Sequence, residues 1–484
     1  MHVLLASSEL HPFSKTGGLA DAVAALAHAV ARTGCQVSVI TPLYRGMADK
    51  AVGLRRADWR FDLPLGPRLV SGEFWRLEVQ PNLTYWFVGQ SGFFDRAGLY
   101  GEANLDYPDN AARFLFLAKA AALLARHHPV PPAIIHGHDW QLGLLPLLIH
   151  HERIAGGRSE SPRTVFTIHN LAYQGGFSVN AWQLTNLPLS WFHLESAAHH
   201  GQLNFLKGAL CLSDALTTVS PRYAEEICTP EYGCGLDGVL RRRGHDLTGI
   251  LNGVDYSEWN TTANPALPHA YDALHLAGKA ANKAALQQEL GLPIRPELPL
   301  FGNITRLTGQ KGCDLVLEAL ERLLPVERLQ FVLLGNGDPA LEESYRQLAA
   351  RFPRQVVCRI GFDSRLAHRI EAGCDFYVMP SRFEPCGLNQ MYSLRYGTVP
   401  IVRATGGLDD SVIDPRADAD LANGIKFREI SSAALEQAWR KALALFTHPV
   451  GLQHFRLNGM TADFSWDRQA KHYLDLYREV LHGP

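Results

Sequence analysis

The chain has 484 residues, of which 46% are hydrophobic and 19% are charged, a composition typical of a folded globular protein and not of a disordered one. Because one hydrophobic core stops growing at about 250–300 residues, this length predicts at least two domains. The 46 basic and 48 acidic residues give a net charge of −2, which excludes a general basic field for nucleic acid or an anionic membrane. Any anion must therefore be bound locally.

The cysteines and the apolar stretches indicate the cellular compartment of the protein. The eight cysteines have neither the short paired spacings of a zinc site nor the density of a small secreted domain. No apolar stretch reaches the roughly 18 residues that a membrane span needs. The sequence opens without a basic leader and an apolar segment, so no signal or transit peptide is expected. We therefore expect a cytoplasmic protein without membrane contact.

Short apolar runs alternate with helical patterns along the first half, as in a series of βαβ units. Buried strands are expected at residues 3–8, 36–42, 133–138, 164–169 and 215–220. Helices are expected at 19–32 and 111–126, and a hairpin at 73–88. The first half therefore predicts an α/β domain built on a parallel sheet.

The second half repeats the same rhythm. Its strands are expected at residues 299–305, 329–334, 356–361, 376–380 and 399–403. Residues 259–268 are rich in Asn, Thr, Ala and Pro, which is typical of a linker. We predict an α/β fold of two Rossmann-like, doubly wound domains, 1–258 and 269–465, that face a cleft. The C-terminal residues 466–484 carry a helical pattern that could pack on either domain.

The loop after the first expected strand reads KTGGLAD and contains Lys15, Gly17 and Gly18 just before a helix that begins near Leu19. Adjacent glycines let backbone N–H groups approach a ligand, and the helix N-terminus and Lys15 both favour an anion. A solvated loop that caps the helix is the simpler alternative, which Lys15 disfavours. The loop matches neither GxGxxG nor GxxxxGK[ST], so neither a dehydrogenase nor a P-loop protein is indicated.

A loop of the second domain, NITRLTGQKG, contains two cations. Arg306 stands at the end of an expected strand, and Lys311 precedes a helix that begins near Cys313. Two cations and a helix N-terminus suit a departing diphosphate, because negative charge grows on the leaving oxygen as the bond breaks. Basic residues at a surface turn are the simpler alternative, but the position at a strand end favours function.

The loop PSRFEPCGL follows the fourth expected strand of the second domain and contains Glu384 and Cys386. A carboxylate at this position can accept hydrogen bonds from sugar hydroxyls. The backbone N–H groups of Gly387, Leu388 and Asn389 can bind phosphate at a helix start. The alternatives are that Glu384 only offsets a helix dipole and that Cys386 is a packing residue.

Histidines stand at two strand ends of the first domain, in HGHDW and TIHN. The pattern of His136, His138 and Asp139 is similar to the start of an HxHxDH zinc-ligand set, but Trp140 follows and the final His is missing. We therefore expect no metal site. These histidines, with His169, can equally be hydrogen-bonded structural residues or parts of the site.

Six motifs together resemble the bacterial glycogen synthase and starch synthase family: KTGGLAD, HGHDW, TIHNLAYQG, LNGVD, RLTGQKG and SRFEPCGL. The resemblance covers essentially the whole chain. It implies a retaining GT-B glycosyltransferase fold, in which the C-terminal helix crosses back to the first domain. The absence of a transit peptide fits the bacterial branch of the family better than the plastid branch.

The resemblance implies transfer of glucose from ADP-glucose to the nonreducing 4-hydroxyl of an α-1,4-glucan, with retention, release of ADP and no metal or other cofactor. The donor- and sugar-binding residues that it implies are Lys15, Gly17, Gly18, Asp21, Asn252, Gly387, Leu388 and Asn389. The catalytic residues that it implies are Asp139, His169, Arg306, Lys311, Glu384 and Cys386.

Within that set, Arg306 and Lys311 are expected to neutralise the leaving group, and Glu384 to hold the glucosyl hydroxyls. The main-chain carbonyl of His169 is expected near the anomeric carbon, and Cys386 has no defined task. Two positions depart from the family pattern: Phe362 stands where Tyr is expected, and Asn389 stands where Thr is frequent.

Two other functions stay open from the sequence. The first is a retaining GT-B enzyme that uses UDP-glucose or another donor, and the second is a glucan-binding protein without activity. The expected partners are ADP-glucose and an α-1,4-glucan such as glycogen or a maltooligosaccharide, with no nucleic acid. The sequence carries no signal for an oligomeric state.

Overall fold

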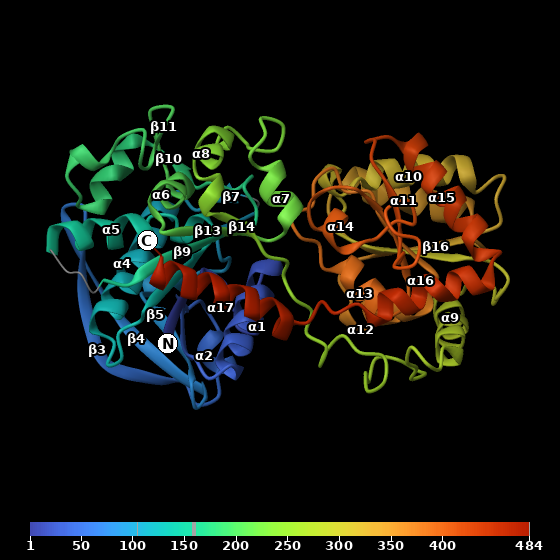
Figure 1. Ribbon diagram of the computed structural model, residues 1–484, viewed down its shortest axis with the longest axis horizontal. Helices are drawn as coiled ribbons and strands as arrows, with labels where there is room; N and C mark the ends of the chain where they lie inside the picture. Colours follow the sequence, from blue (N-terminus) through green and yellow to red (C-terminus); the bar gives the residue numbers. More distant parts are fainter. Residues whose placement is uncertain (104, 157–160, 484) are drawn as a thin grey trace. The chain divides into compact units, whose positions relative to one another are not determined.

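The computed structural model describes residues 1–103, 105–156 and 161–483, and it divides into two compact units, each described by itself (Figure 1). Unit 1 contains Met1–Val219, Ala224–Gly253 and Trp466–Pro484. Unit 2 contains Ser220–Tyr223 and Val254–Ser465. Among the described residues, no helix is long and apolar enough to cross a membrane.

The described part of unit 1 is built on a nine-stranded sheet with the order β14-β13-β9-β8-β1-β2-β5-β4-β3. Its strands are β1 His2–Ala6, β2 Gln36–Pro42, β3 Arg55–Leu65, β4 Arg68–Gln80, β5 Leu83–Gly89, β8 Ile134–His138, β9 Arg163–Ile168, β13 Ala215–Thr218 and β14 Leu247–Gly249. The strands from β14 to β5 pair in parallel, and β4 and β3 continue the sheet as antiparallel strands. The five expected strands of this half are confirmed.

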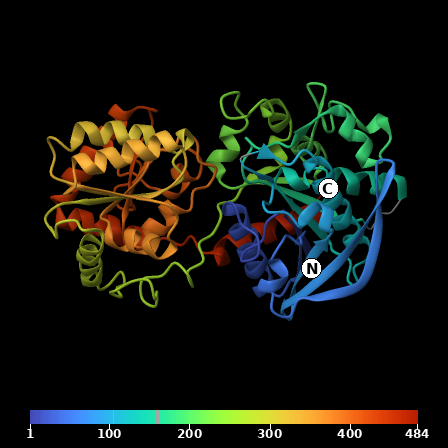
Figure 2. The same ribbon diagram turned by 180° about the vertical axis from the view of Figure 1, so that it is seen from behind.

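The hairpin expected at 73–88 is the antiparallel pair of β4 and β5, and β3 extends it at the edge of the sheet (Figure 2). The sequence did not predict β3, because its largely exposed strand lacks a continuous apolar run. Two small sheets complete the unit: β6 Gly101–Glu102 with β7 Leu105–Asp106, and β10 Gly176–Phe177 with β12 Gln202–Asn204 and β11 Ala198–His199.

The helices of unit 1 include the two that were expected at 19–32 and 111–126. The α-helices are α1 Gly18–Arg32, α2 Met47–Lys50, α3 Ser91–Phe94, α4 Asn110–His127, α5 Leu145–Gly156, α6 Phe205–Leu212, α8 Asp237–Arg242 and α17 Trp466–His482. α7, Pro221–Glu226, begins in unit 2 and ends in unit 1. Short 3-10 helices occur at Trp140–Leu142, Val179–Thr185, Leu189–Trp191 and Gly244–Asp246.

The C-terminal helix α17 belongs to unit 1, where it lies beside α1 (Figure 1). Its buried face repeats every three to four residues and includes Ala470, Tyr473 and Tyr477. An exposed ion pair joins Arg32 of α1 to Asp467 of α17 at 2.6 Å. The helix therefore crosses back to the first unit, as expected for the fold.

Unit 2 is built on a parallel six-stranded sheet with the order β17-β16-β15-β18-β19-β20 in its described residues. The strands are β15 Leu300–Ile304, β16 Gln330–Gly335, β17 Val356–Ile360, β18 Phe376–Met379, β19 Val399–Arg403 and β20 Ile425–Phe427. This is the 3-2-1-4-5-6 order of a doubly wound domain, which reverses direction between β15 and β18.

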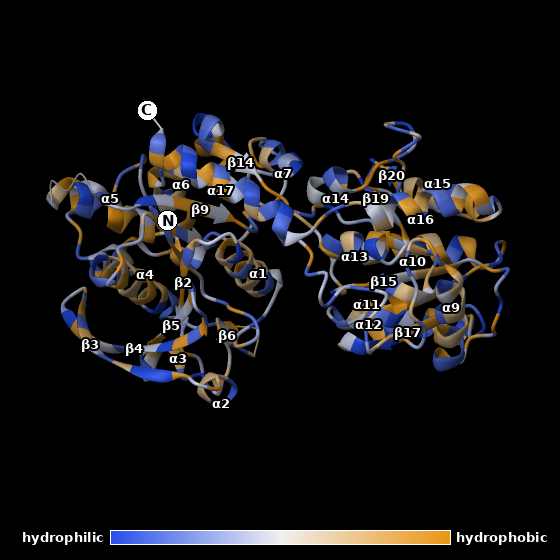
Figure 3. Ribbon diagram, turned by 60° about the horizontal axis from the view of Figure 1, so that its bottom comes forward, coloured by the Kyte–Doolittle hydropathy of each residue, from blue (hydrophilic) through white to orange (hydrophobic). Residues whose placement is uncertain are grey.

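Helices cover both faces of the unit 2 sheet, and hydrophobic and hydrophilic residues alternate along them (Figure 3). They are α9 Ala277–Leu290, α10 Cys313–Leu323, α11 Pro339–Arg351, α12 Ser364–Gly373, α13 Asn389–Arg395, α14 Gly406–Ser411, α15 Ser432–Phe446 and α16 Pro449–Thr461, with a 3-10 helix at Gly309–Lys311. Successive side chains alternate between faces: Phe331 packs with α10 and α15, and Val332 packs with α9 and α12. The two-domain α/β class is thus confirmed.

The segment 259–268, which was expected to be a linker, is packed into unit 2 instead. The ring of Trp259 stacks on Tyr392 with 3.6 Å between centroids, and the Thr261 hydroxyl donates to the Tyr271 carbonyl at 2.6 Å. The polar composition of this segment suggested a linker, but it did not reveal that its tryptophan has an aromatic partner in α13. The division between the units follows Gly253 and not residue 258.

Candidate active site

Most of the predicted site residues of unit 1 lie on loops at the point where the strand order reverses. β1 is central, with β2 on one side and β8 on the other, so the loops after β1 and β8 leave the sheet in adjacent positions. Open α/β sheets bind ligands at such a point, outside the carboxyl ends of the strands. The KTGG loop follows β1 and Asp139 follows β8.

The KTGG loop ends at the N-terminus of α1, which begins at Gly18 with Gly17 as its N-cap. Among the described residues, no side chain caps this helix start, and a Cβ atom on Gly17 would meet nothing within 4 Å. The Lys15 ammonium lies 2.6 Å from the carboxylate of Asp21, which also lies 3.4 Å from the His11 ring. Lys15 and Asp21 are thus brought together beside an open helix N-terminus that favours anions.

Glu9 anchors this loop, although no sequence pattern indicated its role. Its side chain is buried and accepts hydrogen bonds from the Thr16 backbone N–H, the Thr16 hydroxyl and the Tyr100 hydroxyl. The Tyr100 oxygen also lies 2.8 Å from the hydroxyl of Ser8. These bonds fix Thr16 next to Gly17, so the loop does not depend on a ligand for its shape.

Asp139 has a strained backbone at the end of β8. Its φ of 57° and ψ of 172° fall in a region that is essentially restricted to glycine. Its N–H donates to the Thr167 carbonyl at 3.1 Å, and its carboxylate accepts from the His169 N–H at 2.8 Å. Strain of this kind persists only where neighbours hold it and is concentrated at functional sites.

Burial raises the pKa of Asp139 to about 7, and the negative charge of Glu9 adds to this effect. The backbone N–H groups of His169 and Asn170 act in the opposite direction because they bond to the ionised carboxylate. Asp139 and His169, both predicted site residues, are therefore held together by a direct hydrogen bond.

The histidines of the two strand ends are hydrogen-bonded to protein groups. His169 Nε2 lies 3.1 Å from His138 Nδ1, and His136 is bonded to Tyr477 and Thr167. Burial lowers the pKa of His136 and of His169 to about 3, so both rings are neutral. Across the described ranges, no group of three or more His, Cys, Asp or Glu residues is arranged to hold a metal ion.

Asn252 follows β14, the strand at one edge of the same sheet. Its side chain is 7% exposed, and its Oδ1 atom has no hydrogen-bond partner among the described residues. The next residue must be glycine, because a Cβ atom on Gly253 would lie 2.6–2.7 Å from atoms of Trp466. Asn252 is thus a buried amide with an unused acceptor.

The predicted site residues of unit 2 also lie at a reversal of strand order, between β15 and β18. Arg306 and Lys311 follow β15, and Glu384 follows β18. The Lys311 ammonium lies 2.6 Å from a Glu384 carboxylate oxygen, which also accepts from the Ser381 hydroxyl at 3.0 Å. The structure thus joins two residues that the sequence separates by 73 positions.

The loops that carry this pair are in close backbone contact. Gly312 has a φ of 68°, and a Cβ atom there would lie 2.4 Å from the Pro380 carbonyl oxygen.

Arg306 is exposed, and its guanidinium makes no hydrogen bond or ion pair within the described part of the chain. Phe362, which departs from the family pattern, is 88% exposed.

The remaining predicted residues of unit 2 surround the start of α13. Gly387 has a φ of 69°, Leu388 is the N-cap, and the helix begins at Asn389. The Asn389 side chain donates to the Ile304 carbonyl and to the Tyr377 hydroxyl, both at 2.7 Å, so this side chain holds the end of β15. Cys386 is buried, with 6% of its surface exposed.

A second TGGL sequence, at residues 405–408, was not predicted to belong to the site. A Cβ atom on Gly406 would lie 2.0 Å from the Glu384 carbonyl oxygen, and one on Gly407 would lie 2.0 Å from the Cys386 carbonyl oxygen. The N-terminus of α14 therefore packs directly under the loop that carries Glu384. The signal that could have found it is the repetition of TGGL, which also begins α1 at residues 16–19.

Comparison with known proteins shows the family of this chain. Residues 2–242 match the family described as starch synthase catalytic domain, and residues 288–445 match glycosyl transferases group 1. A glycogen synthase of Anaeromyxobacter sp. (strain Fw109-5) is 50% identical over 482 residues, which cover 99% of each chain. The chain belongs to the glycogen synthase family. It is therefore a glycosyltransferase with the GT-B fold.

Two solved structures extend the comparison. The catalytic domain of starch synthase IV from Arabidopsis thaliana, solved with ADP and acarbose bound, is 34% identical, has a TM-score of 0.87 and covers 99% of each chain. The sucrose-phosphate synthase of Thermosynechococcus elongatus is 17% identical, has a TM-score of 0.62 and covers all of both chains, so it shares the fold with this glycogen synthase family member.

Proposed function

We propose that this glycosyltransferase transfers glucose from ADP-glucose to the nonreducing 4-hydroxyl of an α-1,4-glucan, with retention of configuration and release of ADP. The observation that carries the proposal is the ion pair of Lys311 with Glu384, where the strand order of unit 2 reverses, in a loop that also carries the exposed Arg306. ADP bound to the Arabidopsis starch synthase supports an adenine nucleotide as the leaving group.

The two cations have complementary parts in this proposal. The Arg306 guanidinium is exposed and makes no hydrogen bond or ion pair among the described residues, so it can bind the diphosphate without losing another contact. Lys311 is held by Glu384 at a fixed position, so it is preorganised. Cations aligned in advance stabilise the leaving diphosphate most when its charge is largest, which is in the transition state. They supply the charge that a metal ion supplies in other transferases.

Glu384 has two oxygens with different surroundings. Oε2 accepts from Lys311 and from Ser381, and no hydrogen bond to Oε1 occurs within the described residues. We assign Oε1 to a hydroxyl of the transferred glucose. A charged acceptor makes a stronger hydrogen bond than a neutral one, so this contact fixes the sugar in one orientation.

In unit 1, the open N-terminus of α1 and Lys15 are proposed to contact the donor, with Asp21 setting the position of Lys15. Asp139 and His169 are proposed to face the transferred sugar, and the main-chain carbonyl of His169 to stabilise positive charge at the anomeric carbon. The unused acceptor of Asn252 is proposed to bind a sugar hydroxyl. We infer no proton transfer by His169, because its neutral ring has a low pKa.

A donor comparison tests the proposal. Purified protein is given a glycogen primer with either ADP-glucose or UDP-glucose, and glucose incorporation is measured for each donor. We expect a clear preference for ADP-glucose, with the new residues joined by α-1,4 linkages. Preference for UDP-glucose would overturn the donor assignment, and binding of glycogen without incorporation from either donor would overturn the transfer itself.

A further inference from the structure

The C-terminal helix reaches the centre of the unit 1 sheet through one hydroxyl group. The Tyr477 hydroxyl of α17 lies 2.7 Å from His136 Nδ1 of β8, and both side chains are fully buried. These residues are 341 positions apart in the sequence. No sequence motif indicated this contact.

His136 is held at both ring nitrogens. Its Nε2 atom lies 2.6 Å from the Thr167 hydroxyl, which in turn lies 2.5 Å from the Thr217 hydroxyl on the next strand. A neutral imidazole has one donor and one acceptor, and hydroxyl groups can take either role. Tyr477 and Thr167 therefore satisfy the buried ring completely, whichever nitrogen carries the proton.

Two contacts lead from His136 to the site. The first is contact between the rings of His136 and His138, whose planes are tilted by 31° with 4.2 Å between centroids, and His138 Nδ1 lies 3.1 Å from His169 Nε2. The second passes through Thr167, whose side chain bonds to His136 and whose carbonyl accepts the N–H of the strained Asp139. Both contacts end on the two residues that are joined by the bond from the His169 N–H to the Asp139 carboxylate.

We propose that Tyr477 is a positioning residue for the transfer reaction, which holds His136 so that Asp139 and His169 keep their arrangement at the ends of β8 and β9. Without its hydroxyl, His136 Nδ1 is left without a partner in the core, so the ring is expected to shift toward another partner. Because the His136 ring contacts the His138 ring and is bonded to Thr167, that shift reaches Asp139 and His169. The consequence for catalysis rests on the proposed role of these two residues.

Tyr477→Phe tests this because it removes one oxygen atom and keeps the ring. Leu476→Ala, a buried residue of the same helix, is the matched control, since it weakens the packing of α17 through lost apolar contact. The two readouts are kcat with saturating donor and glucan, measured well below the melting temperature of both variants, and hydrogen exchange of the His169 amide, which requires no substrate.

We expect Tyr477→Phe to lower kcat by about tenfold, since small misplacements of reacting groups cost one to two orders of magnitude. The His169 amide should exchange faster in Tyr477→Phe than in the wild type. Leu476→Ala should be less stable than the wild type, but its kcat and its His169 exchange should not change to a matching extent. Wild-type exchange in Tyr477→Phe would overturn the proposal, as would equal losses of kcat in the two variants. Faster exchange in a protein that transfers no glucose would instead locate the failure in the proposed function.

Discussion

The ammonium of Lys311 and the carboxylate of Glu384 form an ion pair of 2.6 Å in which the side chains are 19% and 7% exposed. Removing one partner of a largely buried pair leaves the other charge without compensation, which costs about 3–5 kcal/mol, whereas removing both is much less costly. The same two residues carry the proposed function. Stability and catalysis can therefore be separated by comparing single and double variants.

We predict that Lys311→Met lowers the free energy of unfolding by about 3 kcal/mol, and that adding Glu384→Gln to it recovers most of this loss. The kcat should fall by about 100-fold or more in Lys311→Met, in Glu384→Gln and in the double variant, because each lacks a group that acts in the transition state. Urea unfolding and steady-state kinetics measure the two effects. Near-normal kcat in both single variants would contradict the assigned roles.

Two glycines in TGGL sequences should respond differently to the same substitution. Gly17→Ala places its methyl group in open space, so we expect wild-type stability and a raised KM for ADP-glucose, since the methyl group occupies room reserved for the donor. Gly406→Ala forces a methyl group against the Glu384 carbonyl at a φ of 45°, so we expect lower stability as well as lower kcat. Thermal unfolding and kinetics distinguish the two.

Gly244→Ala is the control, because a Cβ atom on Gly244 also meets nothing within 4 Å among the described residues. Gly244 lies in a 3-10 helix away from the point where the strand order of unit 1 reverses. It should change neither stability nor KM by more than the error of measurement. Wild-type kinetics in Gly17→Ala would show that no ligand approaches this helix N-terminus.

The raised pKa of Asp139 predicts a pH-dependent cost to stability. The unfolded carboxyl group has a pKa of 3.8 and the folded one about 7, so the folded state disfavours the charged form. The cost is absent below pH 4, grows as the pH rises to about 7 and is constant above that. Asp139→Asn removes this cost, because the amide is neutral at every pH.

We therefore expect Asp139→Asn to gain stability over the wild type between pH 5 and pH 8, while losing most of its activity. Urea unfolding at both pH values measures the difference between the two proteins. A stability difference that does not change between these two pH values, or that favours the wild type more at pH 8, would contradict a raised pKa of Asp139.

The strand positions were predictable because the buried parallel strands are continuous apolar runs, and the loops after them carry Lys15, Arg306 and Glu384. The pairing of Lys311 with Glu384 followed from neither motif alone, since it requires β15 and β18 to be neighbours. Glu9 has no local signal for burial beneath the KTGG loop.

The strained φ of Asp139 depends on bonds to Thr167 and His169, which lie about 30 residues away. The same reason explains the linker prediction that failed at Trp259, whose aromatic partner Tyr392 is remote in sequence. Local patterns thus predicted the elements and the loops, while contacts between distant residues decided the geometry within each unit.

Arg306→Ala should change function without changing stability. The side chain is exposed and makes no ion pair among the described residues, so the free energy of unfolding should stay within about 0.5 kcal/mol of the wild type. The KM for ADP-glucose should rise and kcat should fall, with Arg306→Lys intermediate, because lysine keeps the charge but not the two-pronged hydrogen bonding.

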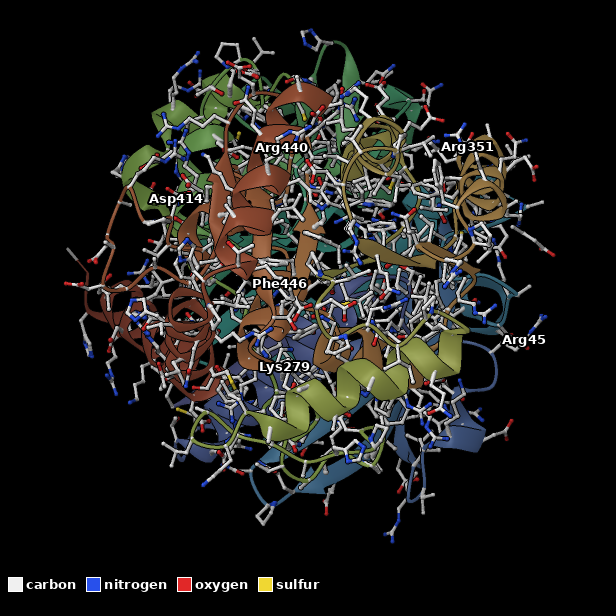
Figure 4. The ribbon with its side chains drawn as sticks, turned by 90° about the vertical axis from the view of Figure 1, so that its right-hand side faces the viewer. Arg45, Lys279, Arg351, Asp414, Arg440 and Phe446 are labelled. Atoms are coloured by element: carbon white, nitrogen blue, oxygen red, sulfur yellow. The ribbon has the colours of Figure 1, made fainter. Side chains whose placement is uncertain are left out.

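Arg351→Ala is the control for Arg306, since this arginine lies on the surface of unit 2 and pairs with Glu321 at 3.0 Å (Figure 4). An exposed pair of this kind contributes less than about 1 kcal/mol to stability, and we expect unchanged kinetics. Equal kinetic effects of the two substitutions would indicate a general loss of positive charge and not a specific diphosphate contact.

The most direct test of the central claim is the ratio of ADP released to glucose incorporated, measured with ADP-glucose and a maltooligosaccharide primer in the presence of EDTA. The proposed mechanism predicts one ADP for each new α-1,4-linked glucose and no loss of rate in EDTA. ADP release without elongation of the primer, or a rate abolished by EDTA and restored by a divalent metal, would contradict it.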